Sequence, residues 1–278
     1  MAADDHERRT IVVGVDSSDS ARHASEWAAD LAAAWEVPLL LVHTVRDGGD
    51  TTEVPPWLRE LLDGAERVGA EPAGAEVLAG SVDDVLLERS GAARLLVVGS
   101  YGEGAREGML AGSTALALLD RSRCPVAVVR GSAPQLPPPR RGPVVVGADA
   151  STTGESALEL AADLAAASGA RMIAVHAWTD VVADASGGLH RMKADGTELA
   201  GRAVELLDAL VKRLRDRHPD LDVERRVVND TALRALLEQA RDARMIVVGH
   251  RDRESVVGRL GSTSRGLVEF ASCPVVVT

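Results

Sequence analysis

Residues 95–113 read LLVVGSYGEGAREGMLAGS, and the rest of the chain is organised around this stretch. The apolar run Leu95–Gly99 predicts a buried strand, Gly102 lies three positions later in a glycine-rich loop, and Gly112 comes before Ser113 at the head of a run with helical spacing. A strand, a glycine-hinged loop and a helix N-terminus bring unpaired backbone N–H groups to the positive end of a helix dipole. The pattern favours a site for a phosphate-bearing ligand, and a plain glycine turn is the alternative interpretation.

The sequence contains an internal duplication. The matching segments are 11–20 with 144–153, 40–45 with 173–178, 95–100 with 245–250, and 124–129 with 273–278. These alignments place Asp16 on Asp149, His43 on His176 and Gly99 on Gly249. The second copy has 17 extra residues between His176 and its third strand. We expect its second helix to hold them.

A proline-rich segment, GSAPQLPPPRRG at 131–142, joins the two copies. Proline cannot supply the N–H groups of a sheet ladder, so the segment reads as a semi-rigid spacer. The sequence therefore predicts a first domain over 1–132, a linker over 133–142 and a second domain over 143–278.

Apolar strand patterns and helical patterns alternate in both copies, and the central strands are apolar throughout. In the first copy we expect strands at 10–16, 38–45, 75–79, 95–99 and 126–129, and helices at 21–35, from 55 to about 69, at 82–89 and at 112–120. In the second copy the expected helices are 155–168, 199–217, 233–239 and 263–270, with Gly169 ending the first. This order predicts an α/β fold with two tandem open parallel five-stranded sheets, each covered by helices on both faces.

The order of the strands would locate a crevice. If the order is 3-2-1-4-5, the direction of winding reverses between the first and fourth strands, and ligands of open α/β sheets bind beyond the strand ends at that reversal. Asp16 follows the first strand and Gly99 ends the fourth. A carboxylate and a glycine loop would thus flank one crevice, which is the arrangement that a nucleotide needs.

Composition excludes several classes of function. A formal net charge of −11 and a pI near 5.1 oppose nonspecific binding to nucleic acid or anionic membranes. Cys124 and Cys273 are far apart and belong to no metal-binding motif, so a buried thiol is favoured over a reactive one at both positions. The charged N-terminus lacks a signal-peptide core and no long apolar run follows, so a cytoplasmic protein is expected.

The spaced glycines, the strand ending Gly-Val-Asp at 14–16 and the Cys-Pro-Val strand together resemble the universal stress protein family, here in tandem. The resemblance covers both halves and implies a Rossmann-like fold of the adenine nucleotide alpha hydrolase type that binds ATP. Carried over to this sequence, it implicates Asp16, Val42, Gly99, Gly102, Gly112, Ser113 and Thr114. Ala115 departs from the pattern, because a small hydroxyl residue is common there.

The second copy departs further from the family pattern. Asp252 replaces the second glycine and the loop is one residue shorter, although the helix head and Asp149 are retained. Whether this copy binds ATP stays open. Its candidate residues are Asp149, Val175, Gly249, Gly261, Ser262, Thr263 and Ser264.

No P-loop, dinucleotide fingerprint, nucleophile elbow or zinc signature is present, and no residue is singled out as catalytic. The leading hypothesis is a nonenzymatic ATP-binding module for stress response or signalling, with Mg²⁺ held through the phosphates and no metal ligand from the protein. A slow ATP hydrolase or phosphotransferase and a nucleotide-free scaffold are the alternatives. The resemblance also implies that the two fifth strands pair into an internal pseudo-dimer, and a homodimer of chains stays open.

Overall fold

The computed structural model describes residues 10–45, 49–102, 111–133, 136–179, 181–183, 189–191, 196–250 and 260–278. Asp252 and most of the first glycine loop therefore lie outside the described residues. Among the helices that are described, none is both long enough and apolar enough to cross a membrane.

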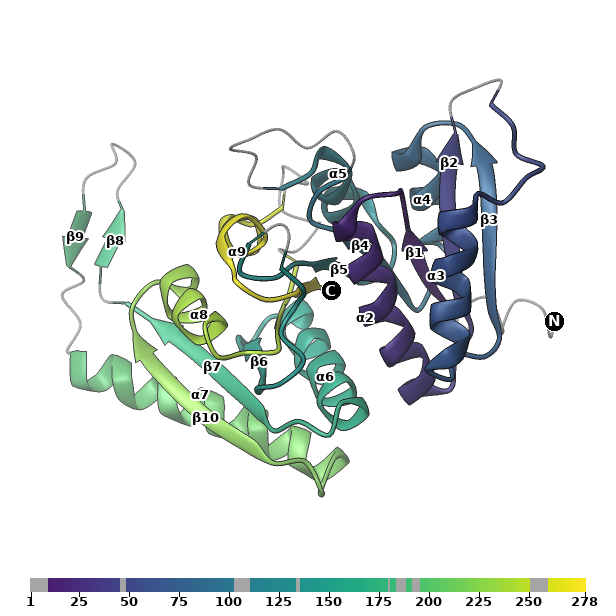
Figure 1. Ribbon diagram of the computed structural model, residues 1–278. Coiled ribbons are helices and arrows are strands. Elements are labelled where there is room, and N and C mark those ends of the chain that lie inside the picture. The colour runs from purple at the N-terminus through teal and green to yellow at the C-terminus, as the bar shows by residue number, and fades with distance from the viewer. Residues whose placement is uncertain are drawn as a thin grey trace.

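Strands and helices alternate along both halves of the chain (Figure 1). The first half contains β1 (Ile11–Gly14), α2 (Asp19–Trp35), β2 (Leu39–Val45), α3 (Pro56–Arg67), β3 (Ala73–Ala79), α4 (Val82–Arg89), β4 (Leu95–Gly99), α5 (Ser113–Arg121) and β5 (Val126–Val129). The second half contains β6 (Val144–Gly147), α6 (Thr152–Ala167), β7 (Met172–Trp178), β8 (Val181–Ala183), β9 (Leu189–Arg191), α7 (Gly196–Arg217), β10 (Val223–Asn229), α8 (Ala232–Ala240), β11 (Met245–Val248), α9 (Ser262–Phe270) and β12 (Val275–Val277).

The strand order predicted for each half is confirmed, and the two sheets join through their fifth strands, as the resemblance implies. They form one ten-stranded sheet in the order β10-β7-β6-β11-β12-β5-β4-β1-β2-β3. Within this ten-stranded sheet every pairing inside a half is parallel, whereas β5 and β12 pair antiparallel, with Ala127 opposite Val276. Since each half would otherwise end in an apolar edge strand, pairing the two edges covers both.

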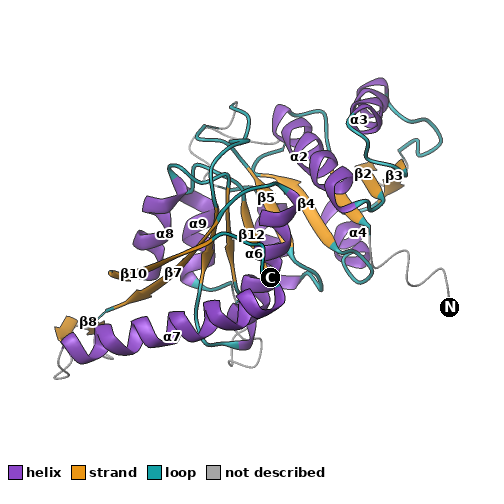
Figure 2. Ribbon diagram, turned by 90° about the horizontal axis from the view of Figure 1, so that it is seen from below, coloured by secondary structure: helices purple, strands orange, loops and turns teal. Residues whose placement is uncertain are grey.

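Two apolar clusters lie on opposite faces of the sheet, and helices cover both faces (Figure 2). One cluster packs under α2, α3, α6 and α7, and the other under α4, α5, α8 and α9. The central strands have apolar residues at successive positions because both of their faces are buried. Each cluster contains residues of both halves, so the two halves share their core.

The capping residues explain where two of the helices begin and end. Ser18 and Ser151 accept hydrogen bonds from backbone N–H groups in the first turns of α2 and α6. Gly169 follows α6 with φ of 59°, which confirms the left-handed ending expected from the sequence. At the equivalent place after α2, Glu36 adopts the same conformation with φ of 53°.

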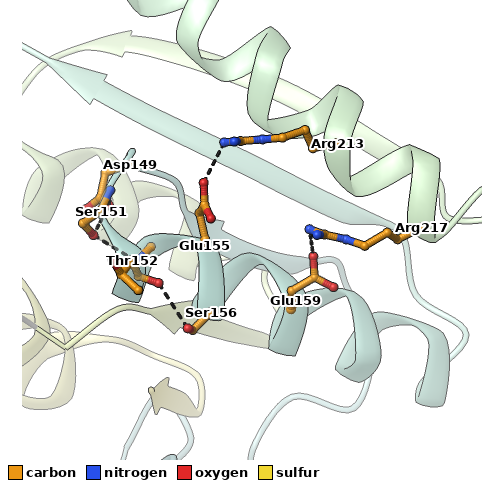
Figure 3. Close-up of polar contacts among 9 residues, drawn as sticks. Asp149, Ser151, Thr152, Glu155, Ser156, Glu159, Arg213 and Arg217 are labelled. Carbon is orange, nitrogen blue, oxygen red and sulfur yellow. Dashed lines mark hydrogen bonds and ion pairs between the residues drawn. The ribbon is translucent and has the colours of Figure 1, made fainter.

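The extra residues of the second copy are only partly in its second helix, so the expectation that this helix holds all of them is wrong. Helix α7 has 22 residues against 12 in α3, and the remaining residues lengthen the connection before it, which includes the antiparallel pair β8–β9. Arg213 and Arg217 of α7 pair with Glu155 and Glu159 of α6 (Figure 3).

Candidate functional site

A cavity of about 350 Å³ opens beyond the carboxyl ends of β1 and β4, where the order of the strands reverses. Six of the seven candidate residues of the first copy line it: Asp16, Gly99, Gly102, Gly112, Ser113 and Thr114. They come from three separate segments of the chain, which meet because the ends of parallel strands lie at one edge of the sheet.

The Asp16 carboxylate stands on one side of this cavity in a fixed orientation. Its Oδ1 accepts hydrogen bonds from the backbone N–H of Ser18 (3.0 Å) and from the Ser18 hydroxyl. A Cβ atom added at Gly102 would lie 2.6 Å from Asp16 Oδ2. The glycine at position 102 therefore leaves room for the carboxylate beside the loop.

The N-terminus of α5 forms the opposite side of the cavity. The Gly112 N–H donates to the Ser100 carbonyl (2.8 Å), so this one amide is occupied by the protein itself. The first intrahelical bond runs from Leu116 N–H to the Gly112 carbonyl, and the glycine N-cap has no side chain that could accept a hydrogen bond. Three N–H groups, those of residues 113–115, are thus left without an intrahelical partner at the positive end of the helix.

Val42 is placed differently from the other candidates. It is 1% exposed, its carbonyl accepts from the Val15 N–H (2.9 Å), and it does not line the cavity. The next two residues of β2, His43 and Thr44, line the cavity instead. The ring of His43 is held by a 3.0 Å contact between Nδ1 and the Val15 carbonyl, and because a carbonyl only accepts, Nδ1 carries the proton.

Tyr101 is a lining residue that the sequence analysis did not single out. Its backbone N–H donates to Ser20 Oγ (3.3 Å), which ties the start of the glycine loop to α2. Its position could have drawn attention to it, because this one tyrosine of the chain lies between two of the candidate glycines, Gly99 and Gly102.

The second copy has a smaller cavity, of about 230 Å³, at the equivalent place. Of its candidate residues, Asp149, Val175, Gly249, Thr263 and Ser264 line it, whereas Gly261 and Ser262 do not. The Asp149 carboxylate accepts from Ser151 just as Asp16 does from Ser18, and His176 Nδ1 contacts the Ala148 carbonyl (2.8 Å). The two copies thus keep the same acidic side and differ at the helix head.

The two helix ends are linked across the domain boundary. Asp120, in the last turn of α5, accepts a hydrogen bond from the Leu260 N–H (3.1 Å), directly before the N-cap of α9. Arg130, which follows β5, donates to the carbonyls of Val268 and Glu269 at the far end of α9 (2.5 and 2.8 Å). These contacts fix α9 against the first half of the chain.

The buried thiol expected at both cysteines is confirmed for Cys273, whereas Cys124 is partly exposed. Cys273 is fully buried, and desolvation raises the pKa of its thiol to about 12; burial also raises the pKa of the Cys124 thiol. These shifts lower the thiolate fraction, and the thiolate is the reactive form.

We therefore expect Cys273 to resist a disulfide reagent such as DTNB at pH 8 until the protein is unfolded. The pKa of this thiol is 9.0 in the unfolded chain and about 12 in the folded chain. Its contribution to the free energy of unfolding is therefore present below pH 9 and is lost as the pH rises toward 12. Counting reacted thiols before and after adding denaturant checks this, and rapid labelling of native Cys273 would contradict it.

Comparisons with known proteins agree on one family. The family model described as the universal stress protein family matches residues 7–130 and again 141–278. A universal stress protein of Mycobacterium tuberculosis is 33% identical, with 96% of both chains covered, and one of Mycolicibacterium smegmatis is 32% identical with the same coverage. The crystal structure of a universal stress protein from Archaeoglobus fulgidus has a TM-score of 0.67 at 18% identity, covering 97% of each chain.

Proposed function

The chain belongs to the universal stress protein family, and from that premise we propose that its first domain binds ATP as a nonenzymatic module for stress response or signalling. One observation carries the proposal. The Asp16 carboxylate, the glycines 99 and 102 and the open N-terminus of α5 line a single cavity at the reversal point of the sheet.

The two sides of the cavity suit the two ends of a nucleotide. A carboxylate accepts hydrogen bonds from ribose hydroxyls, and the N–H groups at the start of α5 donate to phosphate oxygens. The described lining of this cavity contains no lysine or arginine. Mg²⁺ bound through the phosphates would therefore supply the positive charge, as it does in sites that hold this ion through substrate.

The second cavity is the weaker candidate for ATP. It is smaller, and Gly261 and Ser262 at its helix head do not line it. We propose that the first domain binds ATP more tightly than the second. Titration calorimetry with MgATP tests this proposal. We expect it to give either two different affinities or one bound nucleotide per chain.

Ser113→Asp is the sharpest test, because it separates binding from stability. Ser113 is exposed in the first turn of α5, so a carboxylate there interacts favourably with the helix dipole and is expected to raise stability by about 0.5 kcal/mol. The same carboxylate repels phosphate, and we expect the affinity for MgATP to fall by about tenfold or more. Thermal unfolding with and without MgATP measures both effects.

Two variants serve as controls. Asparagine has nearly the same shape as aspartate but no charge, so Ser113→Asn should retain most of the affinity for MgATP. Ser262→Asp makes the same change at the head of α9, where Ser262 is also exposed, and should leave the first site intact. If millimolar MgATP does not shift the wild-type midpoint, the chain is a nucleotide-free scaffold. Steady phosphate release that disappears in Ser113→Asp would establish the ATP hydrolase instead.

A further inference from the structure

The boundary between the two halves contains two arginines at equivalent positions, Arg94 before β4 and Arg244 before β11. The guanidinium of Arg94 lies over the ring of Trp35 at 3.9 Å from its centroid and pairs with Asp163 of α6 (3.7 Å). The Trp35 indole N–H also reaches across the boundary to the Asp163 carbonyl oxygen (3.5 Å). The indole is thus held between a cation and a helix of the other half.

Arg244 lacks this aromatic partner because Ser168 stands at the position equivalent to Trp35. The Ser168 hydroxyl donates back to the Leu164 carbonyl (2.6 Å), and its own carbonyl accepts from Arg244 Nη1 (2.9 Å). Arg244 Nε is buried and has no hydrogen-bond partner among the described residues. Burial lowers the pKa of Arg244, and the attraction of Asp30, the counterpart of Asp163, opposes that shift.

A cavity of about 300 Å³ lies beside Arg244. Its position relative to Arg244 corresponds to the position of the Trp35 indole relative to Arg94. Its walls come from α2, α6, the proline-rich linker and the start of β11, with apolar surface from Trp27, Leu31, Leu164 and Met245. Helices α2 and α6, which contribute two of these walls, lie next to each other near the centre of the molecule (Figure 1).

The charged groups around the cavity balance one another. Arg140 of the linker pairs with Asp30 (2.8 Å) and approaches Glu26 (3.5 Å), and Arg244 is attracted by Asp30. Two cations thus face two carboxylates, so a charged ligand would leave a net charge in the cavity. The flat face of a guanidinium attracts an uncharged aromatic ring, which adds no charge.

We propose that this cavity binds a small, uncharged, planar aromatic heterocycle with an N–H donor, of the size and shape of indole. Its ring stacks on Arg244 as Trp35 does on Arg94, and its N–H donates to the Asp30 carbonyl, the counterpart of the Asp163 carbonyl. The ligand would touch both halves and the linker, so its binding stabilises the boundary between the domains. The site is separate from both nucleotide cavities.

Indole itself is the probe, and paired substitutions test the symmetry directly. The wild type should bind one indole per chain with a dissociation constant of about 1 mM or tighter. Ser168→Trp fills the cavity and should bind none. Trp35→Ser opens the equivalent space beside Arg94 and should bind two, with a larger gain in thermal midpoint on adding indole than the wild type shows. Ligand-observed NMR and the midpoint provide the stoichiometry and the stabilisation.

Two further comparisons keep the test decisive if Ser168→Trp does not fold. Arg244→Gln removes the guanidinium face but can still donate to the Ser168 carbonyl, and it should weaken indole binding about fivefold or more. 1-Methylindole lacks the N–H donor and should bind more weakly than indole to the wild type. Equal binding of indole to the wild type and to Arg244→Gln, or no saturable binding to the wild type, overturns the proposal. Neither readout depends on ATP.

Discussion

Replacing Val276 with aspartate is expected to lower the free energy of unfolding by about 4 kcal/mol or more. Val276 is fully buried in β12, opposite Ala127 of β5, at the seam where the two halves form one sheet. A carboxylate there lies in an apolar core that both halves share, and desolvating a charge without a partner costs several kcal/mol. The seam should open, which exposes two apolar edge strands.

Calorimetry and urea unfolding measure this effect. The wild type should unfold in one transition because both cores extend across the seam, and Val276→Asp should unfold earlier and in separate steps. Val204→Asp is the matched control, since Val204 is 46% exposed on α7 and the same change there should cost about 0.5 kcal/mol or less. A variant at position 276 that is as stable as the control would show that the seam does not join the halves.

Gly99→Ala is expected to have the second largest effect. An added Cβ would lie 2.5 Å from Ser20 Oγ and within 2.9 Å of the Ser20 backbone carbon and oxygen, so β4 and α2 cannot both stay in place. We expect a loss of about 2–4 kcal/mol in stability, together with weaker ATP binding, because Gly99 and Asp16 line the same cavity. Chemical denaturation and the MgATP-dependent midpoint report the two losses.

Gly64→Ala is the control for this substitution. Gly64 lies inside α3, and a Cβ there would approach only the flexible end of Arg67, at 3.6 Å. Alanine favours the helix and restricts the unfolded chain, so this variant should gain about 0.5–1 kcal/mol. If Gly99→Ala were as stable as the wild type, the close approach of β4 to α2 would be contradicted.

Local pattern accounts for much of the fold. The bounds predicted for α4, β4 and β5 agree residue for residue with the structure. The two strands are short apolar runs that are almost fully buried, whereas α4 has one buried residue, Leu86, and lies between two serines, Ser81 and Ser90. The strand order found in each half is the one that goes with the family resemblance, and parallel strands that alternate with helices leave few other arrangements. Six of the seven candidate residues of the first copy line one cavity, because this strand order brings the segments that contain them to the same edge of the sheet.

Other features could not be predicted from local pattern. Val42 does not line the first cavity whereas Val175 lines the second, although both occupy the same position in their strands and pack in the same apolar cluster. The Gly112 amide is occupied by the Ser100 carbonyl, a contact that depends on how the loop returns to the end of β4. The β8–β9 pair was missed because its strands are only three residues long.

Periodicity and spacing along the chain predicted the duplication and the α/β class, and the sequence motifs carried the resemblance to the family and, with it, the order of strands in each half. The pairing of β5 with β12 follows from the resemblance and is confirmed. Which amides at the start of α5 stay open, and that Ser168 leaves a cavity where Trp35 fills one, became evident only from the folded chain. The cavity depends on packing between residues that are more than a hundred positions apart, and the open amides depend on how the loop returns to Ser100, so local preference sets neither.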